Sequence, residues 1–103
     1  MAIYQKLIRD RIPEIIAASG RTCELRTLEP DEYLRSLDAK LGEELQEYLA
    51  DGSLAELADL LEVIHAIVRA RGSSVAELET IRAKKQQERG GFEQRLFLVR
   101  TSD

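Results

Sequence analysis

The stretch EELQEYLADGSLAELAD, residues 43–59, decides the fold because it joins two helical patterns through one turn signal. Before the turn, apolar residues recur every three or four positions over residues 30–50, and the same spacing continues over 53–71. Asp51-Gly52 interrupts the pattern, and Ser53 is a favourable N-cap for the helix that follows. The stretch therefore predicts an antiparallel helix hairpin.

Acidic residues fall on the apolar side of both predicted helices. At about 100° per residue, Glu44 projects inside the apolar sector of the first helix and Glu47 lies at its edge. On the second helix Glu56 projects between apolar positions and Asp59 borders the same edge, whereas Glu62 is expected to face away. Counted from the turn, Glu47 is level with Glu56, and Glu44 is level with Asp59. Four carboxylates are thus expected to converge on one partly buried spot.

Two interpretations of these carboxylates remain open at this point. Buried carboxylates repel one another unless a cation compensates them, and Mg²⁺ prefers oxygen ligands of this kind. Alternatively, Ser53 and Glu56 form a capping box, and the acidic residues of the first helix form a solvated face with Lys40 and Glu44 as an i,i+4 pair.

The rest of the chain adds shorter elements and shows no long linker and no internal repeat. Asp10 is a candidate cap for a helix over 11–19, and a fourth helix is expected over 74–89. Residues 22–28 and 92–100 are strand candidates that could pair. The expected fold is a single all-α domain over residues 1–103, with about four helices and a minor two-stranded β-ribbon.

Composition excludes several classes of protein. The 103 residues carry a formal net charge of -4, and only 5% of them are aromatic, so a binding site for nucleic acid polymers is not expected. No apolar run is long enough to cross a membrane, and the single cysteine predicts no disulfide framework, so a cytoplasmic protein is expected. The wide apolar sector of the 53–71 helix predicts a homo-oligomer, a homodimer or homotetramer.

The spacing of residues 43–47 (EELQE) and 56–59 (ELAD) resembles the EExxE…ExxD signature of the MazG-like all-α nucleoside triphosphate pyrophosphatases. Residues 4–13 (YQKLIRDRIP) and 88–92 (ERGGF) resemble the termini of a small house-cleaning branch of that superfamily, which also includes phosphoribosyl-ATP pyrophosphohydrolase-like proteins. Together these segments cover nearly the whole chain.

The resemblance implies Mg²⁺-dependent hydrolysis of a nucleoside triphosphate, in particular a non-canonical one, to a monophosphate and pyrophosphate. Carried over to this sequence, the metal ligands are Glu44, Glu47, Glu56 and Asp59, and the catalytic positions are Glu43 and Glu44. Eight residues separate Glu47 from Glu56, fewer than in many relatives, which puts base selectivity in doubt more than metal binding.

Two basic groups are candidates for contacts with phosphate. Arg82, Lys85 and Arg89 extend the apolar face of the fourth helix, and Lys6 and Arg9 lie near the N-terminus. Solvated helix ends would give the same pattern on the fourth helix. Two other functions remain open: a catalytically silent helical interaction or regulatory module, and a pyrophosphohydrolase acting on phosphoribosyl-ATP or another nucleotide.

Overall fold

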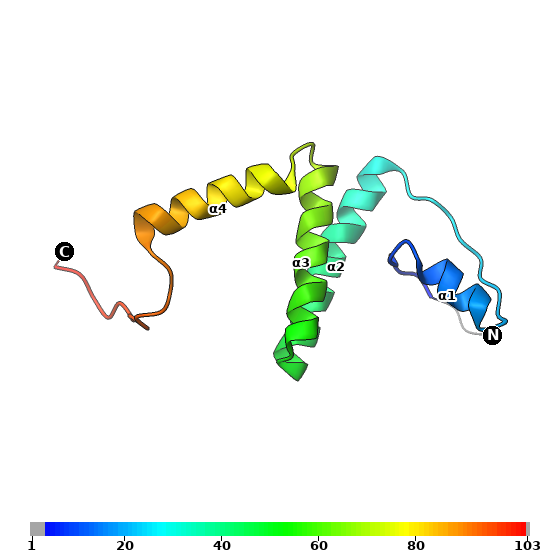
Figure 1. The fold of residues 1–103 in the computed structure, drawn as a ribbon, viewed down its shortest axis with the longest axis horizontal. Helices are drawn as coiled ribbons and strands as arrows, with labels where there is room; N and C mark the ends of the chain where they lie inside the picture. Colours follow the sequence, from blue (N-terminus) through cyan, green and yellow to red (C-terminus); the bar gives the residue numbers. More distant parts are fainter. Residues whose placement is uncertain (1–3, 103) are drawn as a thin grey trace.

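A computed structural model describes residues 4–102 and shows an all-helical chain (Figure 1). Its elements are α1 (Ile12–Ala18), α2 (Pro30–Asp51), α3 (Leu54–Ala70) and α4 (Val75–Arg89). All four lie within one or two residues of the helices that the sequence predicts. None of the described helices is long and apolar enough to cross a membrane.

The α2–α3 hairpin forms at the predicted turn. Gly52 ends α2 in the left-handed conformation, with φ of 72°, and its N–H donates to the Tyr48 carbonyl at 2.7 Å. Glycine adopts this conformation without a steric cost. Ser53 then caps α3, since its Oγ accepts a hydrogen bond from the Glu56 N–H at 3.3 Å. The turn chemistry therefore fixes how the two helices face each other.

The hairpin holds the small core of the chain. Leu37 on α2 and Val63 on α3 are the buried apolar residues of the described part, and the only buried charged residue there is Glu44. The accessible area is 9349 Å², whereas a compact monomer of 11.7 kDa exposes about 5,900 Å². The radius of gyration is 18.4 Å, against about 13 Å for a compact domain of this length. A single chain therefore leaves much of its apolar surface uncovered.

α4 extends away from the hairpin, as Figure 1 shows. It follows a turn at Gly72, where φ is 85°, and Ser74 caps it by accepting a hydrogen bond from the Glu77 N–H at 3.1 Å. Among the described helices, α3 is the one that α4 packs against.

The predicted β-ribbon is wrong for this structure, because residues 4–102 contain no strand. Residues 22–28 lie in the connection between α1 and α2, whereas 92–100 follow α4 on the opposite side of the hairpin (Figure 1). Alternating residues form a strand only when a neighbour supplies hydrogen bonds, and these two segments do not meet.

The cap predicted at the first helix is also wrong. The N-cap of α1 is Arg11, one residue after the predicted Asp10, and no side-chain hydrogen bond is made at that cap. Arg11 instead pairs with Glu14, with 2.9 Å between Nε and Oε2. Pro13 in the first turn needs no hydrogen-bond partner, which leaves a side-chain cap dispensable.

Candidate metal centre

Three acidic side chains meet on one side of the hairpin. Glu44 comes from α2, and Glu56 and Asp59 come from α3. One carboxylate oxygen of each lies within 4.8 Å of the others, a spacing that could hold a metal ion. Glu44 is buried and the two α3 residues are half-buried. The antiparallel geometry predicted from the turn thus brings three of the four predicted ligands together.

Glu47, the fourth predicted ligand, is exposed and does not belong to this group of three. It does lie beside Glu44, because its carboxyl contributes to raising the pKa of Glu44. Glu43 is 45% exposed, and its Oε1 lies 3.8 Å from the Lys40 Nζ. Both residues therefore border the cluster on its exposed side.

Burial makes the Glu44 carboxylate electrostatically unfavourable. The residue is 7% exposed, and its Oε2 is buried without a hydrogen-bond partner. Burial is the main cause that raises the pKa of Glu44, the neighbouring Glu47 adds to it, and Lys40 opposes it. A buried and unpaired carboxylate oxygen is costly, and a cation bound at this position could compensate its charge.

Glu56 also has a buried carboxylate oxygen without a hydrogen-bond partner. This observation bears on whether its side chain belongs to a capping box or to the acidic cluster. Its backbone N–H completes the Ser53 cap, as a capping box requires. The reciprocal hydrogen bond, from the Ser53 N–H to the Glu56 carboxylate, is not formed, and Glu56 Oε2 is buried without a hydrogen-bond partner. The side chain is therefore available to the cluster.

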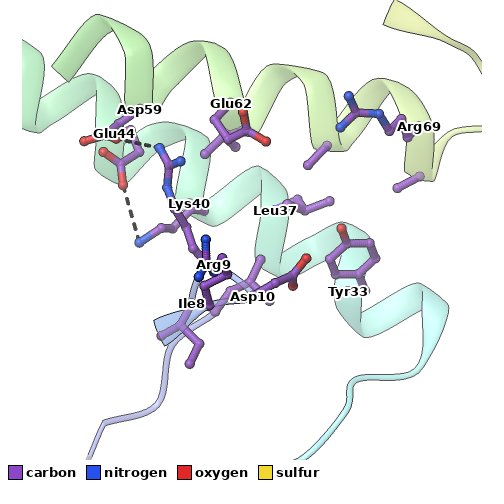
Figure 2. Close-up of a pocket in the computed structure, with 15 residues that line it drawn as sticks. Ile8, Arg9, Asp10, Tyr33, Leu37, Lys40, Glu44, Asp59, Glu62 and Arg69 are labelled. Atoms are coloured by element: carbon purple, nitrogen blue, oxygen red, sulfur yellow. Dashed lines mark hydrogen bonds and ion pairs between the residues drawn. The ribbon is translucent and has the colours of Figure 1, made fainter. Parts of the chain in front are cut away.

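Two cations of the chain flank the carboxylates (Figure 2). Arg9, from the segment before α1, contacts Asp59 with 2.6 Å between Nη2 and Oδ1. Lys40, one turn before Glu44 on α2, places its Nζ 3.4 Å from Glu44 Oε1. The i,i+4 pair predicted from the sequence is confirmed, but it lies at the cluster and is not part of a fully solvated face.

A cavity of about 730 Å³ opens beside the cluster, between residues 7–11 and the hairpin. Its wall includes Leu37, Val63 and Ala66, and charged residues at its margin include Arg9 and Arg69. The volume lies within the range of small-molecule sites. A smaller adjoining cavity of about 270 Å³ shares Arg9, Lys40, Glu44 and Asp59, and Lys6 also lines it.

Sequence reasoning missed several residues of the larger cavity. Glu62 was expected to face away, but it lines this cavity, as Figure 2 shows. Arg69 and Tyr33 line it as well. Helical spacing could have predicted the α3 residues of this cavity. Positions 59, 62, 66 and 69 follow one another at three- and four-residue steps and therefore share one helix face.

The basic residues predicted on the fourth helix do not reach this cavity in one chain. Arg82, Lys85 and Arg89 are exposed on α4, which extends away from the hairpin (Figure 1). Arg82 is held within its own helix by Glu79, with 2.9 Å between Nε and Oε2. Of the predicted phosphate contacts, the structure brings Lys6 and Arg9 to the cluster.

Comparison with known proteins gives one relative. Over 45 residues the chain is 62% identical to an uncharacterized protein of Mycolicibacterium smegmatis. The match covers 44% of this chain and 46% of the relative, so the chain spans less than half the length of that protein. No family model matches the chain, and no solved structure matches it.

Proposed function

We propose that the chain is a Mg²⁺-dependent nucleoside triphosphate pyrophosphohydrolase of the MazG-like kind, acting on non-canonical nucleotides as a house-cleaning enzyme. The observation that carries the proposal is the buried Glu44 carboxylate, with one oxygen unpartnered, facing Glu56 and Asp59 across a helix hairpin. A solvated acidic face would not explain a glutamate residue that is only 7% exposed.

The donor set fits a hard divalent cation. All three residues offer carboxylate oxygens, and no nitrogen or sulfur ligand belongs to the group, which favours Mg²⁺ over softer metals. Mg²⁺ keeps several of its ligand positions for water and substrate phosphates, so a cluster that is open on one side suits it. When bound, the ion would neutralise phosphate charge and activate a water for attack at phosphorus.

The neighbouring residues then have distinct proposed roles. Glu47, on the exposed side of Glu44, completes the ligand set or accepts the proton of the attacking water. Glu43 shares Lys40 with Glu44 and helps to orient that water. Lys6 and Arg9, at the smaller cavity, contact the polyphosphate, and the larger cavity accommodates the nucleoside.

A homodimer or homotetramer is part of the proposal. Leu45 and Leu49 on α2 are 43% and 65% exposed, and Leu57 and Leu61 on α3 are 39% and 50% exposed. By helical spacing these leucines share the hairpin face opposite to the carboxylates. The accessible area exceeds that of a compact monomer by more than a standard interface buries, so a second copy of the chain is the proposed cover. Arg82, Lys85 and Arg89 would then serve the site of a second copy.

The test is pyrophosphate release from a panel of standard and modified nucleoside triphosphates, measured with Mg²⁺ and with chelator. Wild type should release pyrophosphate only with Mg²⁺, and Glu44→Gln should lose at least about a hundred-fold in rate. Glu32→Gln is the matched control, because Glu32 lies on the same helix but pairs with Arg26 away from the cluster. Its rate should equal that of wild type.

Two other results would redirect the proposal. Release from phosphoribosyl-ATP with no release from any nucleoside triphosphate would assign the same centre to a different nucleotide. No release from any of these substrates by folded protein would contradict an enzymatic role and favour the silent interaction module.

A further inference from the structure

One ion pair ties the N-terminal part of the chain to the hairpin. Arg9 Nη2 and Asp59 Oδ1 lie 2.6 Å apart although the residues are 50 positions apart in sequence. Within residues 4–102 no other hydrogen bond or ion pair joins residues 4–20 to α2 or α3, and α1 does not pack against either helix. The polar contact between this segment and the hairpin is therefore made to a carboxylate that belongs to the candidate metal centre.

The guanidinium of Arg9 has N–H donors that the Asp59 contact does not use. Its side chain is 56% exposed, it uses one nitrogen for Asp59, and it lines both cavities. A guanidinium carries five N–H donors and keeps its charge at any physiological pH. The remaining donors are thus open to a second anion at the mouth of the cluster.

A divalent cation bound at the carboxylates would weaken the ion pair between Arg9 and Asp59. A dication bound within a few ångströms of the guanidinium repels it, and it withdraws charge from the shared carboxylate. A polyphosphate arriving with the metal would supply negative charge on the same side and is a bidentate partner for arginine. With both metal and polyphosphate bound, contact of Arg9 with phosphate becomes more favourable than its contact with the Asp59 carboxylate.

We infer that Arg9 acts as an internal counter-ion that competes with free metal for Asp59 and binds the polyphosphate when metal and nucleotide arrive together. The inference rests on the proposed metal centre and deepens it. It makes binding of the bare ion weak and binding of the metal–polyphosphate complex strong, so that metal and substrate affinities are coupled. Arg9 is accordingly a residue that controls the order and selectivity of binding.

The experiment measures Mn²⁺ binding by electron paramagnetic resonance and calorimetry, with no turnover required. Arg9→Gln should bind free Mn²⁺ about five-fold more tightly than wild type, because the competing charge is gone. The same variant should bind the equimolar Mn²⁺–tripolyphosphate complex about ten-fold more weakly, because a charge-assisted contact is lost. Arg9→Lys keeps the charge and should remain close to wild type for the free ion.

Arg26→Gln is the matched control. Arg26 also makes an exposed ion pair with a carboxylate, 2.7 Å from Glu32, but away from the cluster. It should change neither affinity. This control separates a specific competition at Asp59 from a general loss of positive charge.

The outcomes separate the inference from the proposed function. Equal or weaker binding of free Mn²⁺ by Arg9→Gln would overturn the inference, since Arg9 would then only orient Asp59 as a ligand. Unchanged binding of the Mn²⁺–tripolyphosphate complex would overturn the exchange of partners. If Glu44→Gln binds Mn²⁺ as wild type does, or if neither wild type nor Arg9→Gln binds it, the metal centre itself is misassigned.

Discussion

Lys40 and Glu44 stand one turn apart on α2, with 3.4 Å between Nζ and Oε1, and both side chains are largely shielded from water at 20% and 9% exposure. This lysine is the positive charge that opposes the raised pKa of Glu44. The pair therefore limits the cost of keeping an acidic residue in the core of the hairpin.

Lys40→Met should destabilise the metal-free protein by about 1–2 kcal/mol at neutral pH, because Glu44 loses its compensating charge. Mg²⁺ should restore more stability to this variant than to wild type, since the ion replaces the missing charge. Urea unfolding with and without Mg²⁺ measures both effects. Lys84→Met, which removes an exposed lysine 4.0 Å from Glu88, should change stability by less than about 0.5 kcal/mol. Equal losses in the two variants would contradict a role for Lys40 at the cluster.

Glu44→Gln should make the metal-free protein more stable at neutral pH, by about 1 kcal/mol, although it loses metal binding. The folded-state pKa of Glu44 is raised above its ordinary value of 4.5 by burial. Between the ordinary and the raised pKa the folded state holds more protons than the unfolded state, so the free energy of unfolding falls as pH rises through that window. The advantage of the glutamine variant should therefore be present at neutral pH and vanish below 4.5, where Glu44 is protonated.

Chemical denaturation of Glu44→Gln and wild type, with chelator and over this pH range, tests the predicted direction of the stability difference. Glu43→Gln is the control on the same helix, because Glu43 is 45% exposed and its carboxylate is not buried in the hairpin. A glutamine variant at position 44 that is less stable than wild type at neutral pH would show that the carboxylate is satisfied in the folded chain.

Ser53→Ala should lower stability by about 1 kcal/mol and also weaken metal binding. The first effect follows from loss of the hydrogen bond from the Glu56 N–H to the Ser53 Oγ, and the second from freedom gained by Glu56 in the first turn of α3. Ser74→Ala removes the equivalent cap of α4, 3.1 Å from the Glu77 N–H, and should cost stability alone. Calorimetry with Mn²⁺ distinguishes the two serines, and equal metal affinity in both variants would disprove the link between cap and site.

Leu61→Asp should dissociate the proposed oligomer. Leu61 is 50% exposed on the apolar face of the hairpin, so a charge there is tolerated by one chain but is costly once a second chain covers it. Light scattering after size exclusion should report a lower mass than for wild type. Leu25→Asp, at a leucine 57% exposed in the α1–α2 connection, should leave the mass unchanged. A monomeric wild-type protein would contradict the proposed assembly.

The hairpin and its acidic cluster could be predicted because both depend on local signals. Helical periodicity and the turn at Gly52 fix how far Glu44 and Asp59 lie from the turn, and this distance places them level. The contact of Arg9 with Asp59 could not be predicted, because no local pattern reports a meeting of segments 50 positions apart. The direction of α4 also depends on packing that the residues of one helix do not reveal.

The β-ribbon failed for a related reason. Alternation over residues 22–28 reports that one side of the segment is apolar, but it does not identify a partner strand. The prediction for Glu62 was wrong because it compared this residue only with the apolar sector of the helix. Glu62 also shares a helix face with Asp59, three positions before it. Its place beside the cavity follows from that shared face.

The tight turn at Gly52 also determines when the acidic cluster can form during folding. Glu44 and Asp59 are only fifteen positions apart, so closing the loop between them costs little chain entropy, and their meeting needs no contact with distant segments. Hairpins of this low contact order form early. The three carboxylates of the candidate metal centre would therefore be in register before the N-terminal segment docks, and the proposed Mg²⁺ could stabilise the hairpin at that early stage.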